Sequence, residues 1–355
     1  MKRIVVSETG GTLARNFEMS LRAAPEKYYI IGISSQPYDL ALSLADEKYL
    51  VPLATDRTFL PVLRTIIKKT HADFLHSQHD VVIKVLANHA DTLPIIMCLP
   101  DKETVNACVD KFESYTRWKA AGVPVAATME IQTPADLKIA QQKYGNGFWI
   151  RLKVGGGGAG SLSVTDLAFA KHWIDYYNGW GRFTASECLS PRSVTWTSIW
   201  NHGEMVVAQG RKRLYWLLAN RTLSGITGVT GAGETVSDPQ VDHLAQRAIL
   251  AIDRAPHGIF SVDMTYDSKG YLRVTEINIG RFFTTIHFFT EAGLNLPYIF
   301  LKLAFGEKIP SLSKKLNPIP SGLLWVRGMD TTPVLTDVKT IEDYKRTLTG
   351  MMKKL

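Results

Sequence analysis

Cysteine is scarce in this chain of 355 residues, which has only Cys98, Cys108 and Cys188. Their number is odd and none stands in a CxxC pair, so neither a disulfide framework nor a zinc site is indicated. Long apolar runs are also missing, and none reaches the length of a membrane span. The first residues lack the pattern of a secretory signal peptide. We therefore expect a cytoplasmic protein that does not interact with a membrane.

Two common nucleotide-binding motifs are absent as well. The first apolar strand is followed by Gly10-Gly11 without a full GxGxxG, and the second lacks the terminal acid that binds a ribose. The glycine run at 155–160 is not a Walker loop, because no Gly-Lys-Ser/Thr follows it. A dehydrogenase is therefore disfavoured. The net charge of +8 comes from scattered basic residues rather than one stripe, so nucleic-acid binding is not expected either.

An acidic segment around residue 270 carries the strongest chemical signal. Residues 267–270 predict a tight turn between two strands, the first carrying Asp263 and the second Glu276 and Asn278. A hairpin lets these side chains converge, and residues two apart on a strand point to the same face. Two carboxylates and an amide oxygen suit Mg²⁺ held together with substrate phosphates. A surface hairpin with solvated acids is the alternative.

A glycine-rich run is the second signal, and it follows an apolar strand predicted at 148–153. Glycine lets backbone N–H groups approach phosphate oxygens, because no Cβ intervenes. Arg151 and Lys153 precede the run and point to one face by the period of two. A flexible linker is the alternative, but an apolar strand with alternating cations rarely precedes a linker. The pattern therefore favours a cover over phosphates.

The order of the remaining segments indicates several subdomains. Strands and helices alternate over about the first hundred residues, which predicts an open, mostly parallel sheet. One helix is predicted over 104–120, a mobile loop over 222–234 and a C-terminal helix over 341–355. Gln78 and Asp80 follow a predicted strand end, where parallel sheets place ligand-binding loops. They are candidates for substrate contact, with a purely structural role as the alternative.

Taken in order, these segments resemble the ATP-grasp superfamily of ligases and, within it, the carbamoyl-phosphate-synthetase-like branch. The strongest match is Asp263, thirteen residues before Glu276-x-Asn278. The resemblance implies an α/β fold in which a parallel-sheet domain precedes a two-part α+β ATP-grasp fold, with ATP in the cleft between the parts. The expected boundaries are 1–109 for the N-terminal domain, 110–185 and 186–310 for the two ATP-grasp subdomains, and 311–355 for a C-terminal extension.

The resemblance also implies roles for individual residues. Asp263, Glu276 and Asn278 would hold two Mg²⁺ ions, for which Mn²⁺ could substitute. Arg213, Arg281 and Lys153 would be catalytic. ATP would be contacted by Lys111, Arg151, Lys153, Gly156, Gly157, Gly158, Gly160, Ser161, Glu187, Cys188 and Leu189. The chain departs from the family at Arg151-Leu152, where Lys-Pro is common, and at Ser190 to Ser193, where an acidic ribose contact is usual.

The expected activity is an ATP- and Mg²⁺-dependent ligase that activates a carboxylate as an acyl phosphate and couples it to an amine. Its partners would be small molecules, with a homodimer left open. Two alternatives remain. One is carbamoyl-phosphate-type activation of bicarbonate, although the chain has a single ATP-grasp half. The other is an ATP-binding sensor without catalysis.

Overall fold

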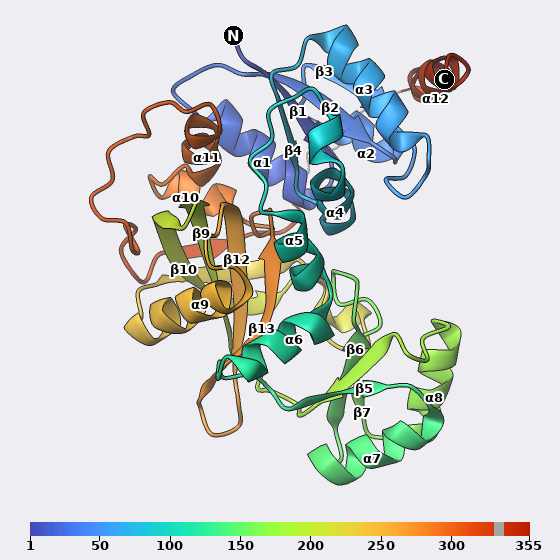
Figure 1. The fold of residues 1–355 in the computed structure, drawn as a ribbon, viewed down its shortest axis with the longest axis vertical. Helices are drawn as coiled ribbons and strands as arrows, with labels where there is room; N and C mark the ends of the chain where they lie inside the picture. Colours follow the sequence, from blue (N-terminus) through green and yellow to red (C-terminus); the bar gives the residue numbers. More distant parts are fainter. Residues whose placement is uncertain (330–336) are drawn as a thin grey trace.

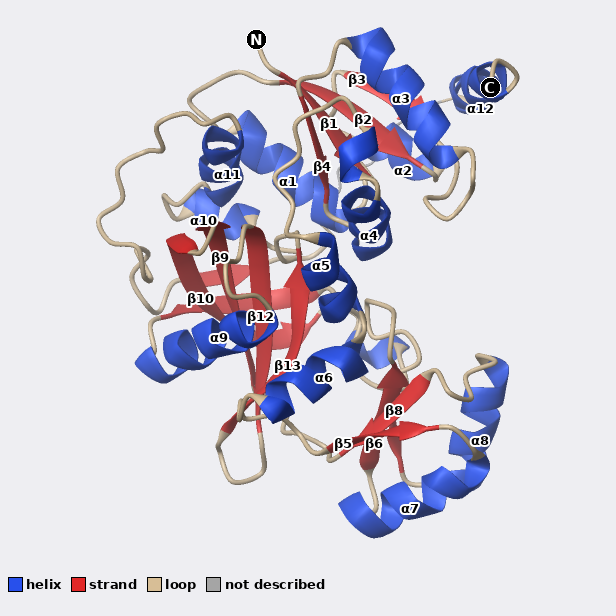
Figure 2. Cartoon of the chain, in the orientation of Figure 1, coloured by secondary structure: helices blue, strands red, loops and turns tan. Residues whose placement is uncertain are grey.

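The computed structural model describes residues 1–329 and 337–355. Within them the strands form three sheets, each with its own helices (Figure 1). The large sheet lies in the middle of the molecule, with the N-terminal domain at one end of the long axis and a small sheet at the other (Figure 2). This arrangement confirms the predicted order of a parallel-sheet domain followed by a two-part α+β region.

The N-terminal domain is a parallel sheet with strand order β3-β2-β1-β4. Its strands are β1 (Arg3–Ser7), β2 (Tyr29–Ser34), β3 (Glu47–Leu50) and β4 (Phe74–Ser77). Its helices are α1 (Thr12–Arg22), α2 (Pro37–Leu42), α3 (Phe59–Thr70), α4 (Asp80–Asn88) and the short η1 (Ala90–Thr92). Residues 4–7 of β1 are buried in succession because helices cover both faces, as is usual for parallel sheets.

Two helices connect this domain to the rest, where the sequence predicts one. They are α5 (Lys102–Val109) and α6 (Lys111–Ala120). The prediction of one helix is wrong because Asp110 leaves the helical conformation, and its side chain accepts hydrogen bonds from the N–H groups of Phe112 and Glu113. Such a cap satisfies free donors at a helix start. Lys111 is therefore the first residue of a new helix.

The small sheet is antiparallel, with order β5-β8-β6-β7. It consists of β5 (Thr128–Ile131), β6 (Phe148–Leu152), β7 (Leu162–Val164) and β8 (Phe183–Ser186). The helices α7 (Pro134–Tyr144) and α8 (Leu167–Tyr176) pack on it around a separate apolar core. A capping box of Thr133 and Asp136 starts α7, with Pro134 at its first position.

The large sheet has the order β13-β12-β9-β10-β11-β14. Its strands are β9 (Ser193–Asn201), β10 (Glu204–Trp216), β11 (Thr230–Val236), β12 (Gly258–Tyr266), β13 (Leu272–Ile279) and β14 (Leu324–Val326). The loop predicted over 222–234 is thus partly wrong, because from Thr230 the backbone pairs with β10. A short helix η2 (Ala219–Arg221) precedes that strand.

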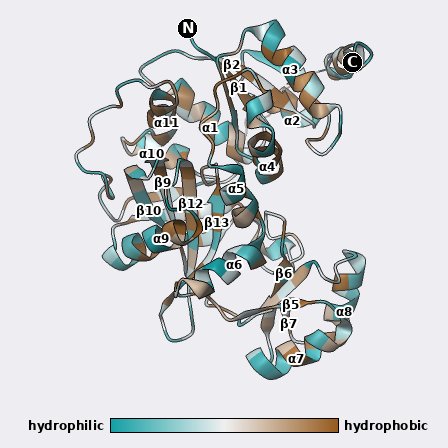
Figure 3. Cartoon of the chain, viewed as in Figure 1, coloured by the Kyte–Doolittle hydropathy of each residue, from teal (hydrophilic) through white to brown (hydrophobic). Residues whose placement is uncertain are grey.

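The two faces of the large sheet differ in chemistry. Trp196, Val262 and Met264 point to one face and pack against helix α9 (Pro239–Ile252) in a buried apolar cluster. Thr195 and Asp263 alternate with them and point to the other face, as the period of two requires. Apolar residues gather on the strands and on α11 (brown in Figure 3). One face of the sheet is therefore structural, and the other is left for polar chemistry.

One apolar core connects the N-terminal domain to the large sheet. Phe17 of α1 stacks near Phe282, and Phe300 packs edge-on to Phe74 of β4. The helices that carry this contact are α10 (His287–Glu291) and α11 (Leu296–Ala304). The C-terminal helix α12 (Val338–Met352) returns to the first domain, where Leu348 contacts its second core. In the described residues, every helix is too short or too polar to span a bilayer.

The predicted domain boundaries are not tested by any comparison and stay predictions. The packing itself places α6 on the large sheet, since Trp118 is buried against α9 and donates its indole N–H to the carbonyl of Ala248 at 2.9 Å. Residues 324–326 of the expected extension also join that sheet through β11.

Candidate functional site

The hairpin of β12 and β13 forms as the sequence predicts. The turn closes through Asp267, whose backbone carbonyl accepts the N–H of Gly270 at 3.0 Å. Asp263 lies opposite Glu276 in the register, and the Asn278 amide nitrogen donates to Asp263 Oδ2 at 3.0 Å. A bulge after Asp263 lets the side chains of Asp263, Glu276 and Asn278 share one face despite their odd separation. The three predicted metal ligands therefore converge.

The donor set of the hairpin fits a hard divalent cation. Asp263 and Glu276 bring two carboxylates together, while the described residues hold no cluster of three or more His, Cys, Asp or Glu side chains suited to a metal. Mg²⁺ typically takes one or two protein carboxylates and completes its shell with phosphates and waters. The Asn278 amide oxygen is turned to Arg281, so Asn278 would become a ligand only after its amide rotates by half a turn.

Arg281 joins the hairpin to the N-terminal domain. Its guanidinium donates to Asp80 at 2.5 and 3.1 Å and to Asn278 Oδ1 at 2.5 Å. Burial alone would lower the pKa of Arg281, but the adjacent Asp80 carboxylate raises it. Burial would likewise raise the pKa of Asp80, and the charge of Arg281 lowers it instead. Both groups are therefore charged, and this pair fixes Arg281, a predicted catalytic residue, against the first domain.

Lys111 and Arg151 approach Glu276 from the other side. The Lys111 ammonium donates to the carbonyl of Gly155 at 2.5 Å and lies 3.6 Å from Glu276. Arg151 donates to the carbonyl of Thr275 at 2.9 Å and lies 3.9 Å from Glu276. Burial lowers the pKa of both cations, although the Glu276 carboxylate counteracts it. These two predicted phosphate contacts thus lie beside a predicted metal ligand.

The glycine run at 154–161 closes against the loop at 217–229. A Cβ added to Gly158 would lie 2.8 Å from the Ile226 side chain, and one added to Gly228 would lie 2.7 Å from Gly157. Gly157, Gly158 and Gly160 have φ of +64°, +74° and +72°, which only glycine adopts easily. Ser161 is buried at the end of the run. The glycine run, predicted to cover phosphates, thus contacts the loop at 217–229.

Four predicted site residues lie apart from the acidic hairpin. Lys153 forms an ion pair with Glu130 across the small sheet at 2.7 Å, and within the described residues it has no ion pair with the hairpin acids. Glu187, Cys188 and Leu189 form the connection from β8 to β9, between the two sheets. The Glu187 carboxylate accepts the backbone N–H of Ala127 at 3.1 Å, and Cys188 is exposed. Their predicted contact with ATP stays a prediction.

Arg211 is a site residue that the sequence reading missed. It points to the polar face of β10, is 1% exposed and lies two residues before Arg213. Burial first, then the like charges of Arg213 and Arg327, lower the pKa of Arg211 to about 9, so the guanidinium stays charged at neutral pH. Its position two residues before Arg213, which is the side-chain period of a strand, was the signal that could have identified it.

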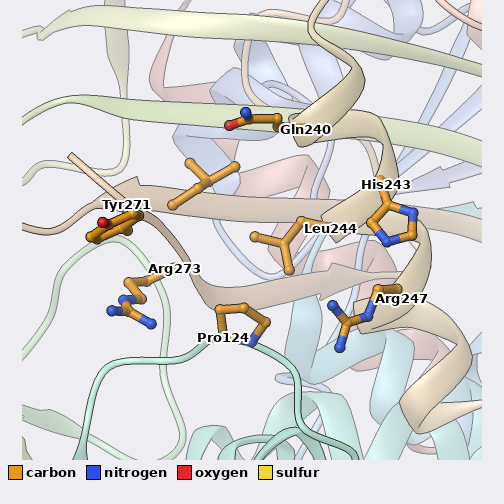
Figure 4. Close-up of a pocket in the computed structure, with 8 residues that line it drawn as sticks. Pro124, Gln240, His243, Leu244, Arg247, Tyr271 and Arg273 are labelled. Atoms are coloured by element: carbon orange, nitrogen blue, oxygen red, sulfur yellow. The ribbon is translucent and has the colours of Figure 1, made fainter.

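A surface pocket lies elsewhere on the large sheet. It has a volume of about 480 Å³ and lies between α9, the β12–β13 turn region and the segment around Pro124 (Figure 4). The two guanidinium groups that line it already have partners: Arg247 donates to the carbonyl of Gly122, and Arg273 pairs with Asp267. Because α9 lines it, the pocket lies on the apolar face of the sheet, opposite the candidate site.

Comparison with solved structures decides the fold. Carboxyaminoimidazole ribonucleotide synthase from Aspergillus clavatus, solved with ATP, has a TM-score of 0.67 and 17% identity, covering 89% of this chain and 80% of that one. Biotin carboxylase from Campylobacter jejuni gives 0.66 and 18%, with coverages of 87% and 72%. The chain has the ATP-grasp fold. L-Amino acid ligase from Bacillus licheniformis gives 0.63 and 13%, with coverages of 86% and 74%.

The sequence itself matches one family, over residues 4–96, described as the PylC-like N-terminal domain. No curated protein matches the chain. The N-terminal sheet domain of this ATP-grasp chain is thus similar to a family domain, and the structural likeness extends through the large sheet. The predicted ATP-grasp fold is confirmed, while the placement in the carbamoyl-phosphate-synthetase-like branch stays a prediction.

Proposed function

We propose that the protein is an ATP- and Mg²⁺-dependent ligase that converts a carboxylate into an acyl phosphate and couples it to an amine. One observation carries the proposal: Asp263 and Glu276 lie among the buried or partly buried cations Lys111, Arg151, Arg213 and Arg281, and Lys111 also hydrogen-bonds to the glycine run. ATP and ADP are bound in solved structures of the same fold, and one neighbour is an L-amino acid ligase.

Each group has a role under this proposal. Asp263 and Glu276 would hold Mg²⁺, which supplies positive charge to the phosphates during transfer. Arg213 and Arg281 would offset the repulsion between the attacking carboxylate and the γ-phosphate. Lys111, Arg151 and the glycine run would bind the other phosphates. The closed cover would exclude water, to which an acyl phosphate is vulnerable.

The test is release of ADP and phosphate from MgATP with pooled carboxylates and amines. Glu276→Gln removes the charge of one proposed metal ligand and is expected to lower the rate by at least about 100-fold, as loss of transition-state charge stabilisation typically does. Glu234→Gln is the matched control, because Glu234 is an acid of the same sheet that pairs with Lys212 at 3.3 Å. An unchanged rate in Glu276→Gln contradicts the proposal.

Bicarbonate activation is the second candidate. It is favoured by one structural neighbour, a biotin carboxylase domain solved with MgADP and bicarbonate, which has a TM-score of 0.69 and 16% identity. ATP turnover that depends on bicarbonate and needs no organic acid would select this activity. ATP binding with no turnover on any acid or on bicarbonate would instead identify a sensor.

A further inference from the structure

Arg211 lies on the polar face of the large sheet, and its charge has no ion pair among the residues that the structure describes. Its two terminal nitrogens donate to the hydroxyls of Thr230 at 3.2 Å and Thr195 at 3.1 Å, while its buried Nε has no hydrogen-bond partner in the described part of the chain. The guanidinium also lies over the Phe283 ring, 4.5 Å from its centre. Across the described residues, no carboxylate comes within ion-pair distance of it. The hydroxyls satisfy hydrogen bonds but do not neutralise the charge.

A second guanidinium shares this environment. Arg213 donates its Nε to the same Thr230 hydroxyl at 3.2 Å, donates to Ser193 at 2.8 Å and lies over the Trp216 ring at 3.6 Å. Its nearest carboxylate, Asp263, is 3.8 Å away. Two cations that converge on one oxygen repel each other, and the buried charge of Arg211, which has no ion pair among the described residues, is unfavourable. The arrangement therefore favours an anion that both can bind.

The register places this pair next to the proposed metal ligands. Glu276, Asp263, Thr195 and Arg211 form one row across four neighbouring strands. Thr195 links the row, since its hydroxyl donates to Asp263 and accepts from Arg211. Arg211 lies two strands from Asp263, which is about 10 Å at the usual strand spacing. An anion at Arg211 would thus lie beside phosphates held at Asp263, on the side away from Glu276.

We propose that Arg211 and Arg213 form a two-guanidinium subsite for the oxyanion of the acid substrate. It would bind the carboxylate before phosphoryl transfer and the acyl phosphate afterwards. This inference rests on the proposed function. In the transfer, a carboxylate oxygen bonds to the γ-phosphorus, the bond to the bridging oxygen breaks, and ADP leaves with the electron pair. Arg211 serves as a binding residue, because planar guanidinium forks match carboxylate and phosphate geometry.

The test uses inorganic phosphate as the probe for the acyl-phosphate position. The melting temperature of the full chain is measured with MgADP at fixed ionic strength while phosphate is titrated. Arg211→Gln is expected to weaken phosphate binding by at least about tenfold, the effect of losing one charge-assisted pair. Arg211→Lys, which keeps the charge without the planar fork, should fall between Arg211→Gln and the wild type.

Lys212→Gln is the matched control, since this exposed cation is adjacent on the same strand and pairs with Glu234. It should bind phosphate like the wild type. All variants should keep the melting shift produced by MgADP alone, which shows that they are folded. If Arg211→Gln does not fold, the intermediate affinity expected of Arg211→Lys decides. Unchanged phosphate binding in the folded Arg211 variants overturns the proposal.

A second arm separates the acid from ATP as the source of the oxyanion. Binding of MgADP and of the magnesium complex of a non-hydrolysable ATP analogue is compared in each variant. Both should stay within about twofold of the wild type in Arg211→Gln if the subsite holds the acid. A selective loss of the analogue would make Arg211 a γ-phosphate contact and overturn the assignment. Absence of any turnover would instead count against the ligase, because neither binding measurement requires it.

Discussion

At the scale of single residues, the site consists of charges held by partners from distant parts of the chain. Asp80 and Arg281 are 201 positions apart and form two hydrogen bonds. The Lys111 ammonium is held by the carbonyl of Gly155 beside Glu276. Each buried charge depends on its neighbours, because a charge that loses its partner keeps its desolvation cost. Single substitutions in these pairs should therefore have large effects.

Asp80→Asn tests the link between the first domain and Arg281. It removes the charge that pairs with Arg281, whose side chain is 11% exposed. We expect the free energy of unfolding to fall by about 2 kcal/mol, the value for hydrogen bonds to charged groups. Chemical denaturation measures it. Asp175→Asn is the control, because Asp175 pairs with Lys171 on the surface of α8 and should cost less than about 0.5 kcal/mol. Equal losses would contradict the prediction.

The same pair predicts a pH dependence. The folded pKa of Asp80 is below its ordinary value of 3.8, since Arg281 more than offsets the effect of burial. A lowered folded pKa adds stability that is present above 3.8 and is lost as pH falls through the folded value. The stability difference between wild type and Asp80→Asn should therefore be constant above about pH 5 and shrink in acid. A difference that grows in acid would contradict this sign.

At the scale of elements, the site is shaped by the glycine run, the 217–229 loop and the break between α5 and α6. The cap at Asp110 ends α5 and starts α6, which positions Lys111 at the glycine run. The run itself contacts the 217–229 loop through Gly158 and Ile226. Because these contacts involve backbone atoms, a small steric change at Gly158 should shift the glycine run and the 217–229 loop relative to each other.

Gly158→Ala is expected to separate the glycine run from the 217–229 loop. A Cβ there would lie 2.9 Å from the carbonyl oxygen of Ile226, which no side-chain rotation can relieve. Amide hydrogen exchange at 222–228 should become about tenfold faster, which corresponds to about 1.4 kcal/mol of lost contact energy. Gly225→Ala carries a similar cost of positive φ, +69°, with open space around it, and controls for backbone strain. Equal exchange in both variants would show that strain alone acts.

At the scale of the whole molecule, three sheets contribute to one site. The first domain supplies Asp80, the small sheet supplies Arg151 and the glycine run, and the large sheet supplies the acids and Arg213. The apolar core around Phe282 and Phe300 fixes the first domain against the large sheet. Helix α12 packs against β3, the edge strand of the first domain (Figure 1).

Leu348→Asp tests whether α12 stabilises the first domain. Leu348 packs against the core that includes Tyr49 of β3, and a carboxylate there would be desolvated. We expect the melting temperature to fall by several degrees, with faster amide exchange in 47–50. Thr349→Asp adds the same charge to the same helix at an exposed position and should leave both unchanged. Unchanged exchange in Leu348→Asp would mean that α12 contributes no stability to the first domain.

Local structural features, which depend on neighbouring residues, could be predicted from the sequence. The turn at 267–270 and the parallel alternation of the first domain were both predicted, because local hydrogen bonds and side-chain periodicity specify them. Tertiary packing determines that Asp80 meets Arg281, that the backbone after Thr230 becomes a strand, and that Arg211 is buried with no ion pair among the described residues. These outcomes depend on which strands pair and which faces are covered. Burial and charge partners therefore appear only when distant segments are packed together.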